Sequence, residues 1–193
     1  MSIIGLTGPT GAGKSTVREC AEELGFFTVD CDAVARMVAG EADVISALCD
    51  IFGQDICENG AINRKKLASR AFSSEENTAL LNKTILPFIR DRIEKLIEGK
   101  PCVLLDAPTL FESGVDKQCS VTVAVIADEK LRKNRIISRD NLSVSDANTR
   151  LSAAKSDAFF KERCDYIIEN NGSIPDLKLK AKQILSKYIT EEN

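Results

Sequence analysis

The sequence predicts an α/β fold built on a parallel five-stranded sheet, and three observations lead to this class. Short apolar segments alternate with segments of helical spacing along the 193-residue chain, a pattern typical of doubly wound parallel sheets. A glycine-rich loop joins the first apolar segment to the first helical one. A long helical stretch separates the second strand from the third, and it is more than a plain crossover, which indicates an insertion.

The first strand and the first helix flank the glycine-rich loop. Residues 2–7 form an apolar segment of strand length. Val17, Cys20, Ala21 and Leu24 follow at helical spacing, which predicts a helix that starts near the end of the loop. The loop therefore lies between a strand and a helix, which is the position that a phosphate-binding loop needs.

Further strands and helices follow in alternation. Residues 26–29 predict a second strand that ends at Asp30-Cys31-Asp32. Residues 33–97 have mainly helical spacing, and we expect Pro87 to interrupt the last of these helices. The remaining strands are expected at 101–105, 121–126 and 166–168, and the remaining helices at 129–163 and about 175–188.

These elements predict one domain that carries two irregular pieces. We expect a core of about residues 1–36, 98–130 and 164–193, which holds the sheet. The helical stretch at about 37–97 is expected to be an inserted substrate-binding subdomain. The segment at about 131–163 is rich in arginine and lysine and is expected to form a helical lid.

Composition excludes several classes of function. The net charge is −3, from 26 basic and 29 acidic residues, which gives no support for a nucleic-acid or membrane partner. No segment approaches the roughly 18 apolar residues of a membrane span, so we expect a cytoplasmic protein. The seven cysteines form no Cys-x-x-Cys pair and indicate neither a disulfide framework nor a zinc site. Histidine is absent, so any general base is a carboxylate, lysine, tyrosine or cysteine.

The glycine-rich loop at residues 8–15 reads Gly-Pro-Thr-Gly-Ala-Gly-Lys-Ser, a complete phosphate-binding loop. Its glycines let backbone N–H groups surround phosphate oxygens, and the helix that follows directs its positive end at the same anion. Lys14 is expected to reach the β- and γ-phosphates of ATP, and Ser15 to offer its hydroxyl to Mg²⁺. The residues expected to bind ATP in this segment are Gly8, Gly11, Ala12, Gly13, Lys14, Ser15 and Thr16.

Acidic residues follow the second and third strands. Ligands of open parallel sheets bind beyond the carboxyl ends of the strands, where Asp30, Asp32, Asp106 and Glu112 are expected. Asp32 is a candidate base for a substrate hydroxyl, and Asp106 a candidate to hold Mg²⁺ through water. Aspartates at these positions also cap helices, so both readings stay open. Pro108 restricts the backbone and suits a wall of the cleft.

Basic residues provide candidate contacts to anions. Arg132, Arg135 and Arg139 are spaced by three and four residues, so they share one face of a predicted helix. Such a face could close over the phosphates of ATP. Arg36 is expected either to contact an anionic substrate or to pair with an aspartate one turn earlier. Further candidates in the helical insertion are Arg64 and Lys65.

With these pieces placed, the chain resembles the dephospho-coenzyme A kinase family nearly from end to end. No motif apart from the phosphate loop is highly specific by itself, but their order and spacing together are. The motifs that carry the resemblance are residues 5–17, Asp30-Cys31-Asp32 with Ala35-Arg36, Phe52-Gly53, residues 63–67 with Phe72, Asp106-Ala107-Pro108 with Leu110-Phe111-Glu112, Arg135 with Arg139-Asp140, and residues 165–168 running into Asn170-Asn171-Gly172-Ser173.

The resemblance implies a P-loop NTPase three-layer fold and transfer of the ATP γ-phosphoryl to the ribose 3′-hydroxyl of dephospho-CoA. Asp32 matches the catalytic base of the family, and Lys14 and Arg139 match its phosphate-stabilising residues. The cofactors expected are ATP and Mg²⁺, and the protein is expected to be a monomer or a weak homo-oligomer. Residues expected to bind ATP or its metal beyond the loop are Arg135 and Asp106, and those expected to bind the acceptor are Asp32, Arg36, Arg64, Lys65, Pro108, Leu110 and Glu112.

The chain departs from the family pattern at four positions. Leu86 stands where the family usually has histidine, and Thr109 where it usually has leucine. Ala154 and Phe160 replace a glutamine and a lysine of the lid region. These departures all lie on the acceptor or lid side, so they leave room for reduced activity or a different acceptor.

Two other classes of function stay open. A kinase for another small hydroxyl metabolite or nucleoside would use the same loop and Asp32. The second class is a nucleotide-dependent switch or interaction protein. A guanine-binding switch would be expected to show Asn-Lys-x-Asp, and the nearest match, residues 82–85, lacks the final aspartate. A dinucleotide-dependent oxidoreductase is disfavoured because the glycine spacing of the loop is wrong for it.

Overall fold

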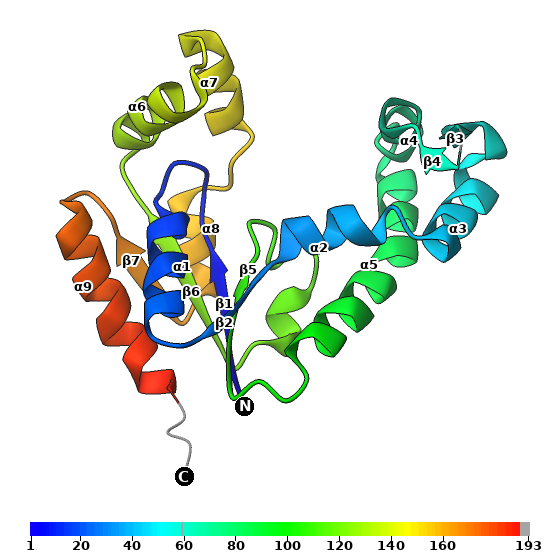
Figure 1. Ribbon diagram of the computed structural model, residues 1–193. Coiled ribbons are helices and arrows are strands. Elements are labelled where there is room, and N and C mark those ends of the chain that lie inside the picture. The colour runs from blue at the N-terminus through cyan, green and yellow to red at the C-terminus, as the bar shows by residue number, and fades with distance from the viewer. Residues whose placement is uncertain (59, 190–193) are drawn as a thin grey trace. The chain divides into compact units, whose positions relative to one another are not determined.

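A computed structural model describes residues 1–58 and 60–189 of the chain (Figure 1). Its centre is a five-stranded sheet in the order β2-β5-β1-β6-β7, in which every neighbouring pair is parallel. This confirms the predicted sheet and the α/β class. The strands are β1 (Ser2–Thr7), β2 (Phe27–Asp30), β5 (Cys102–Asp106), β6 (Val121–Ile126) and β7 (Tyr166–Glu169).

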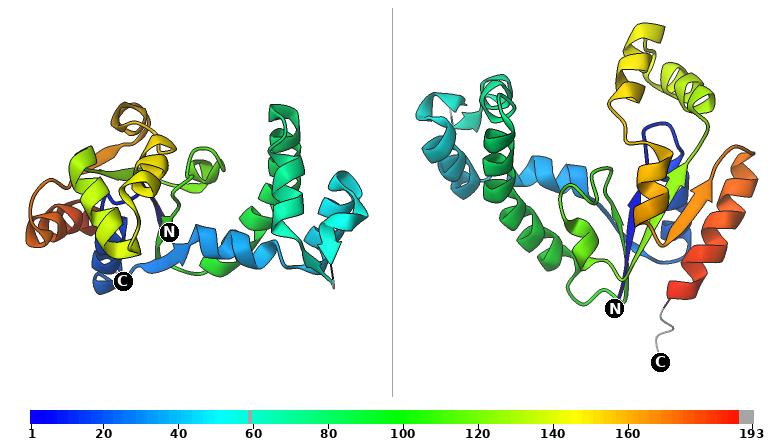
Figure 2. Two further views of the ribbon diagram at one scale, coloured as in Figure 1. Left: turned by 90° about the horizontal axis from the view of Figure 1, so that it is seen from above. Right: turned by 180° about the vertical axis from the view of Figure 1, so that it is seen from behind.

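Helices cover both faces of this sheet. Side chains alternate between the faces of a strand, so Val123 and Val125 of β6 pack beneath α1 (Lys14–Glu23) and α9 (Ile174–Leu185). Ile126 points to the opposite face and packs on Phe160 of α8 (Asp157–Arg163). Figures 1 and 2 show α1 and α8 on opposite sides of the sheet. The three central strands, β1, β5 and β6, are therefore buried on both faces, which explains their continuous apolar runs.

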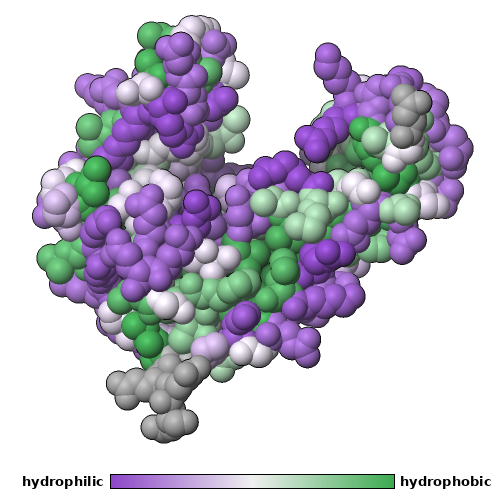
Figure 3. Space-filling view, viewed as in Figure 1, coloured by the Kyte–Doolittle hydropathy of each residue, from purple (hydrophilic) through white to green (hydrophobic). Residues whose placement is uncertain are grey.

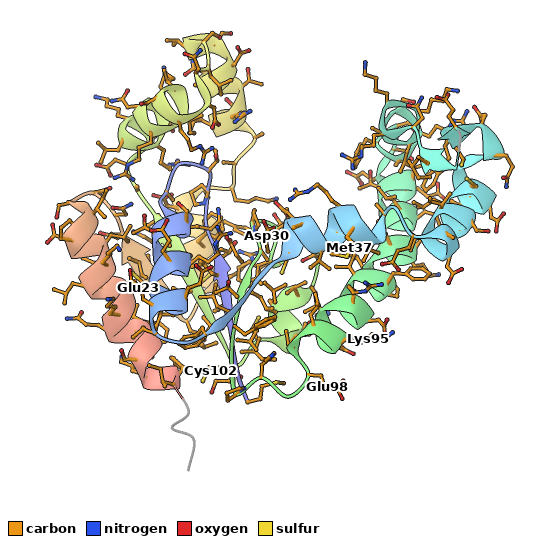
Figure 4. All side chains as sticks on the ribbon, in the orientation of Figure 1. Glu23, Asp30, Met37, Lys95, Glu98 and Cys102 are labelled. Atoms are coloured by element: carbon orange, nitrogen blue, oxygen red, sulfur yellow. The ribbon has the colours of Figure 1, made fainter. Side chains whose placement is uncertain are left out.

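The end of β2 differs from the sequence expectation by one residue. β2 includes Asp30, and α2 (Cys31–Val38) begins directly after it. Asp30 therefore ends the strand at the junction labelled in Figure 4, whereas Asp32 lies in the first turn of the helix. β5 likewise extends to Asp106.

Residues 31–98 form a compact unit of their own. Its helices are α2, α3 (Ala42–Phe52), α4 (Arg64–Ala71) and α5 (Glu75–Ile97), with a short 3₁₀ turn at Gln54–Ile56. The unit is mainly helical, as the sequence predicts, and it also contains an antiparallel hairpin of β3 (Cys57–Glu58) and β4 (Ala61–Ile62) that the sequence analysis does not predict.

Pro87 does not interrupt the last helix of this unit, contrary to expectation. It lies inside α5, which continues to Ile97. A proline removes one backbone donor, but the half of α5 that follows it buries Ile89 and Ile93, and α5 contacts α2 and α3. We attribute the continuity of the helix to this burial.

The second unit consists of residues 1–30 and the described part of 99–193. Besides the sheet it contains α6 (Glu129–Asp140) and α7 (Val144–Ser152), which precede α8, and two 3₁₀ turns, Val115–Gln118 and Ser186–Tyr188. The face of α6 and α7 that Figure 3 presents is mostly hydrophilic. Among the described residues no helix is long and apolar enough to cross a membrane.

Candidate functional site

The phosphate loop connects β1 to α1, as the sequence predicts. Gly8 and Gly13 have positive φ angles of 131° and 106°, which residues other than glycine rarely adopt. A Cβ atom on Gly8 would overlap the Val125 carbonyl, and one on Gly13 would overlap the Asn170 side chain. Glycine is therefore required at both positions by conformation and by close packing. α1 begins at Lys14, so its N-terminal end follows the loop directly.

Three side chains hold backbone carbonyls of the loop. Lys14 Nζ donates to the Gly8 carbonyl at 3.1 Å, and Arg135 Nη1 donates to the Gly11 carbonyl at 3.3 Å. Asn170 Nδ2 donates to the Ala12 carbonyl at 2.7 Å, and this bond is buried. The carbonyl and the next N–H of a trans peptide point in opposite directions. Holding the Ala12 carbonyl on Asn170 therefore turns the Gly13 N–H to the other side of the chain, where an anion can bind.

Asn170 was not selected as a site residue from the sequence. It follows β7, its backbone N–H donates to the Ile126 carbonyl, and its own carbonyl accepts from Arg135 Nη2 at 3.1 Å. Asn170 is buried, with an exposed fraction of 6%. The sequence feature that could have identified Asn170 is a polar side chain at the carboxyl end of an apolar strand. The same feature identifies the aspartates that follow the second and third strands.

The strand-end carboxylates meet at one edge of the sheet. Asp106 of β5 lies opposite Asp30 of β2 in the parallel register. The Asp106 side chain is 14% exposed, and its Oδ2 lies 3.7 Å from Nη1 of Arg18 on α1. Ser15 precedes Arg18 by three residues, so the two lie on the same side of α1. The hydroxyl and the carboxylate expected at the metal site thus belong to neighbouring elements of one unit.

The loop after β5 contains three residues predicted to bind the acceptor, and they differ in burial. The Pro108 carbonyl accepts a hydrogen bond from the Thr7 hydroxyl at 3.2 Å, which joins this loop to the end of β1. Leu110 is fully buried and would collide with any side chain at Gly5, so it supports the loop from the core and offers no surface to a substrate. Glu112 is partly exposed, with Oε1 3.7 Å from Lys155 Nζ.

The three arginines of α6 do not act as one face. Arg132 is buried, and its Nε donates to the Ala127 carbonyl at 3.0 Å. Arg135 contacts the phosphate loop. Arg139 is 62% exposed in its side chain and binds Asp140, with Nε 2.7 Å from Oδ1. The Arg139 guanidinium holds the pKa of the Asp140 carboxyl below its usual value. Of the three, Arg135 is the one whose side chain donates to a loop carbonyl, whereas Arg132 packs its backbone against Gly11 of the loop.

The helical unit contains a cavity of about 540 Å³ that several elements line. Arg36 of α2 and Arg64 of α4 line it together with apolar side chains that include Ile45, Leu67 and Ile85. Lys65, which follows Arg64 in the sequence, is exposed and does not line the cavity. Asp32 is also exposed, one turn before Arg36 on α2. The lining combines an apolar floor with two guanidinium groups.

The residues expected to hold a metal supply oxygen ligands. Ser15 and Asp106 offer hard oxygen atoms, which Mg²⁺ prefers. Among residues 1–58 and 60–189, no cluster of three or more histidine, cysteine or acidic side chains could hold a metal alone. This donor set fits a Mg²⁺ ion that is bound mainly through water and nucleotide phosphates, and does not fit a site built entirely from protein ligands.

Comparisons with known proteins agree on one family. The family model described as Dephospho-CoA kinase matches residues 2–176. A dephospho-CoA kinase of Corynebacterium diphtheriae is 37% identical over 198 residues, which cover 99% of both chains. A solved structure of a Thermus thermophilus protein has a TM-score of 0.82 at 29% identity and 98% coverage of both chains. The structure of a Campylobacter jejuni dephospho-CoA kinase has a TM-score of 0.67 at 25% identity and 96% coverage of both.

Proposed function

The chain belongs to the dephospho-CoA kinase family, and from this premise we propose how its own residues divide the work of phosphoryl transfer. The enzyme phosphorylates dephospho-CoA with ATP, the last step of coenzyme A biosynthesis. The observation that carries the assignment of residues is the phosphate loop, whose carbonyls are held by Lys14, Arg135 and Asn170.

The loop binds the triphosphate of ATP in this proposal. Loop N–H groups and the N-terminal end of α1 face the phosphates. Lys14 exchanges its bond with the Gly8 carbonyl for oxygens of the β- and γ-phosphates, where charge develops during transfer. Arg135 remains at the edge of the loop beside the nucleotide. Arg139 is proposed to leave Asp140 and reach the γ-phosphate, and an arginine in that role contributes about 10³–10⁵ in rate.

Ser15 and Asp106 are proposed to hold Mg²⁺, Asp106 through water. When bound, the ion neutralises charge on the β- and γ-phosphates. Two features support this role. Ser15 is exposed in the first turn of α1, and Asp106 ends a strand adjacent to β1, the strand that leads into the loop.

Asp32 is proposed as the general base for the acceptor hydroxyl. The ribose 3′-hydroxyl gives its proton to the Asp32 carboxylate while its oxygen forms the new bond to phosphorus and ADP leaves. Asp32 is exposed, and only one residue separates it from Asp30 at the end of β2. Assistance of this kind contributes about 10²–10⁴ in rate.

The cavity of the helical unit is proposed to bind the acceptor. Dephospho-CoA combines a diphosphate with a long, weakly polar arm, and the cavity combines Arg36 and Arg64 with apolar side chains. Guanidinium groups bind phosphates through paired hydrogen bonds. Lys65 and Glu112 are also proposed to contact the acceptor. Residues 37–97 are proposed as the substrate-binding subdomain and residues 131–163 as the lid.

We also propose that the protein is cytoplasmic, that it is a monomer or a weak homo-oligomer, and that it has no nucleic-acid partner.

The function is tested with γ-labelled ATP and a panel of acceptors that includes dephospho-CoA, pantetheine, adenosine and shikimate. We expect label to enter dephospho-CoA and the other acceptors to remain essentially unlabelled. Transfer to another alcohol with none to dephospho-CoA would favour the alternative, a kinase of a different small metabolite, which the departures at Leu86 and Thr109 had left open.

A further inference from the structure

Arg18 on α1 stands between two carboxylates. Its Nη1 lies 3.7 Å from Asp106 Oδ2, and its Nε lies 3.7 Å from Glu22 Oε1. The Nε atom is buried and makes no hydrogen bond to any described residue. Both distances exceed the range of a hydrogen bond. The guanidinium is therefore shared between two acceptors and held tightly by neither.

Glu22 is a fixed alternative partner for this guanidinium. Its Oε1 accepts a hydrogen bond from the Thr28 hydroxyl at 2.8 Å, which joins α1 to β2. Glu22 lies one helical turn after Arg18, on the same face of α1, and its side chain is 50% exposed. The Arg18 guanidinium thus lies within 3.7 Å of both carboxylates from a single side-chain position.

Arg18 also lies next to the proposed metal position. It follows Ser15 by three residues on α1, and its guanidinium faces Asp106. A positive side chain there neutralises Asp106 when no divalent ion is bound. The same charge repels an ion that approaches Asp106.

We propose that Arg18 is a positioning residue that competes with Mg²⁺ for Asp106 and moves to Glu22 when Mg²⁺ and ATP bind. This inference rests on the proposed metal role of Asp106. In this proposal the Arg18 guanidinium neutralises the Asp106 carboxylate in the nucleotide-free enzyme. The same positive charge weakens the binding of Mg²⁺. Loss of the Arg18 charge therefore tightens Mg²⁺ binding, whereas a residue with a purely structural role would weaken it or leave it unchanged.

The size of the effect follows from Coulomb's law. In a medium close to water, a positive side chain that faces a metal-binding carboxylate would change the affinity for a divalent ion by roughly three- to tenfold. Salt reduces this value because Arg18 is partly exposed. We expect the apparent Kd for Mg²⁺ to fall by that factor in Arg18→Gln, which keeps much of the side-chain length without the charge.

The test is a titration of Mg²⁺ into each enzyme with a fluorescent ATP analogue at fixed ionic strength, with binding as the readout. Arg18→Lys keeps the charge and should retain a Kd close to that of the wild type. Glu22→Gln removes the alternative partner, so the guanidinium stays at Asp106 and the apparent Kd should rise by about two- to threefold. An unchanged or weaker Mg²⁺ affinity in Arg18→Gln would overturn the counter-ion role.

Asp106→Asn separates this failure from failure of the proposed function. If Asp106→Asn weakens Mg²⁺-dependent binding while Arg18→Gln leaves it unchanged, the metal site stands and the counter-ion role is wrong. If Asp106→Asn binds Mg²⁺ as the wild type does, the metal assignment itself is wrong and the counter-ion role is overturned with it.

Discussion

Replacement of Asn170 by alanine tests how the phosphate loop is held. The change removes the buried donor that binds the Ala12 carbonyl at 2.7 Å, and the carbonyl is left without that partner. An unsatisfied buried polar group costs about 1–3 kcal/mol, so the free energy of unfolding should fall by about that amount. Urea denaturation measures this loss.

The same substitution should weaken ATP binding beyond its effect on stability. Without Asn170 the peptide between Ala12 and Gly13 is free to rotate, and the Gly13 N–H no longer faces the phosphates. A hydrogen bond to a charged group contributes about 1.5–3 kcal/mol, which corresponds to roughly a 10- to 150-fold rise in the Kd for ATP. Titration calorimetry on the folded variant, well below its unfolding transition, gives this value.

Asn171→Ala is the matched control. Asn171 carries the same side chain one residue later, but it is exposed and exchanges hydrogen bonds with Asp128 at 2.9 Å. It should lose less stability than the Asn170 variant and keep the affinity for ATP. If Asn170→Ala lost stability and yet bound ATP as tightly as the wild type, the idea that this amide orients the loop would be refuted.

Three further predictions follow from the site and its surroundings. Lys14→Ala should lower kcat strongly and raise the Kd for ATP, because the removed charge stabilises the transferring phosphoryl; single-turnover kinetics and calorimetry check both. Arg36→Ala and Arg64→Ala should each raise KM for dephospho-CoA with little change in the Kd for ATP, and an equal change in both constants would argue against an acceptor role. The Arg70 guanidinium holds the pKa of Asp55 below its usual value, so their pair stabilises the fold above about pH 4 and loses this effect as pH falls through the lowered pKa. Asp55→Asn should therefore flatten the acid limb of stability against pH, and an unchanged limb in denaturation curves would contradict the assignment.

The sheet and the phosphate loop were predictable because each has a local signal. The central strands β1, β5 and β6 are buried on both faces, so their apolar composition alone indicates them. The loop needs glycine at Gly8 and Gly13 for reasons of backbone conformation, and such requirements are visible in sequence. The family resemblance drew on the same local motifs, and the full-length match supports it.

Other features depended on contacts between distant residues. Asn170 reaches Ala12 across 158 positions of the chain, and nothing near either residue indicates that pairing. Leu110 belongs to a motif of the family resemblance, Leu110-Phe111-Glu112, but packing near Gly5 places its side chain in the core. Pro87 has a strong local preference to end helices, and tertiary burial of α5 overrides it.

The arginines of α6 show the same limit of local reasoning. Helical spacing correctly put them on one helix, but it could not say which partner each guanidinium would find. Arg132 turns to the Ala127 carbonyl, and Arg139 binds the neighbouring Asp140. The Arg135 side chain donates to the Gly11 carbonyl of the loop, and Arg132 approaches the same glycine with its backbone. Helical spacing therefore does not determine which partner each guanidinium contacts in this structure.

In the proposed mechanism Asp32 takes the proton of the dephospho-CoA hydroxyl while the loop holds ATP. A single-turnover measurement of γ-phosphoryl transfer tests it most directly, with wild type and Asp32→Asn each saturated with both substrates. We predict that the variant binds ATP normally and forms coenzyme A about 10²–10⁴ times more slowly. A transfer rate in Asp32→Asn close to that of the wild type would contradict the claim.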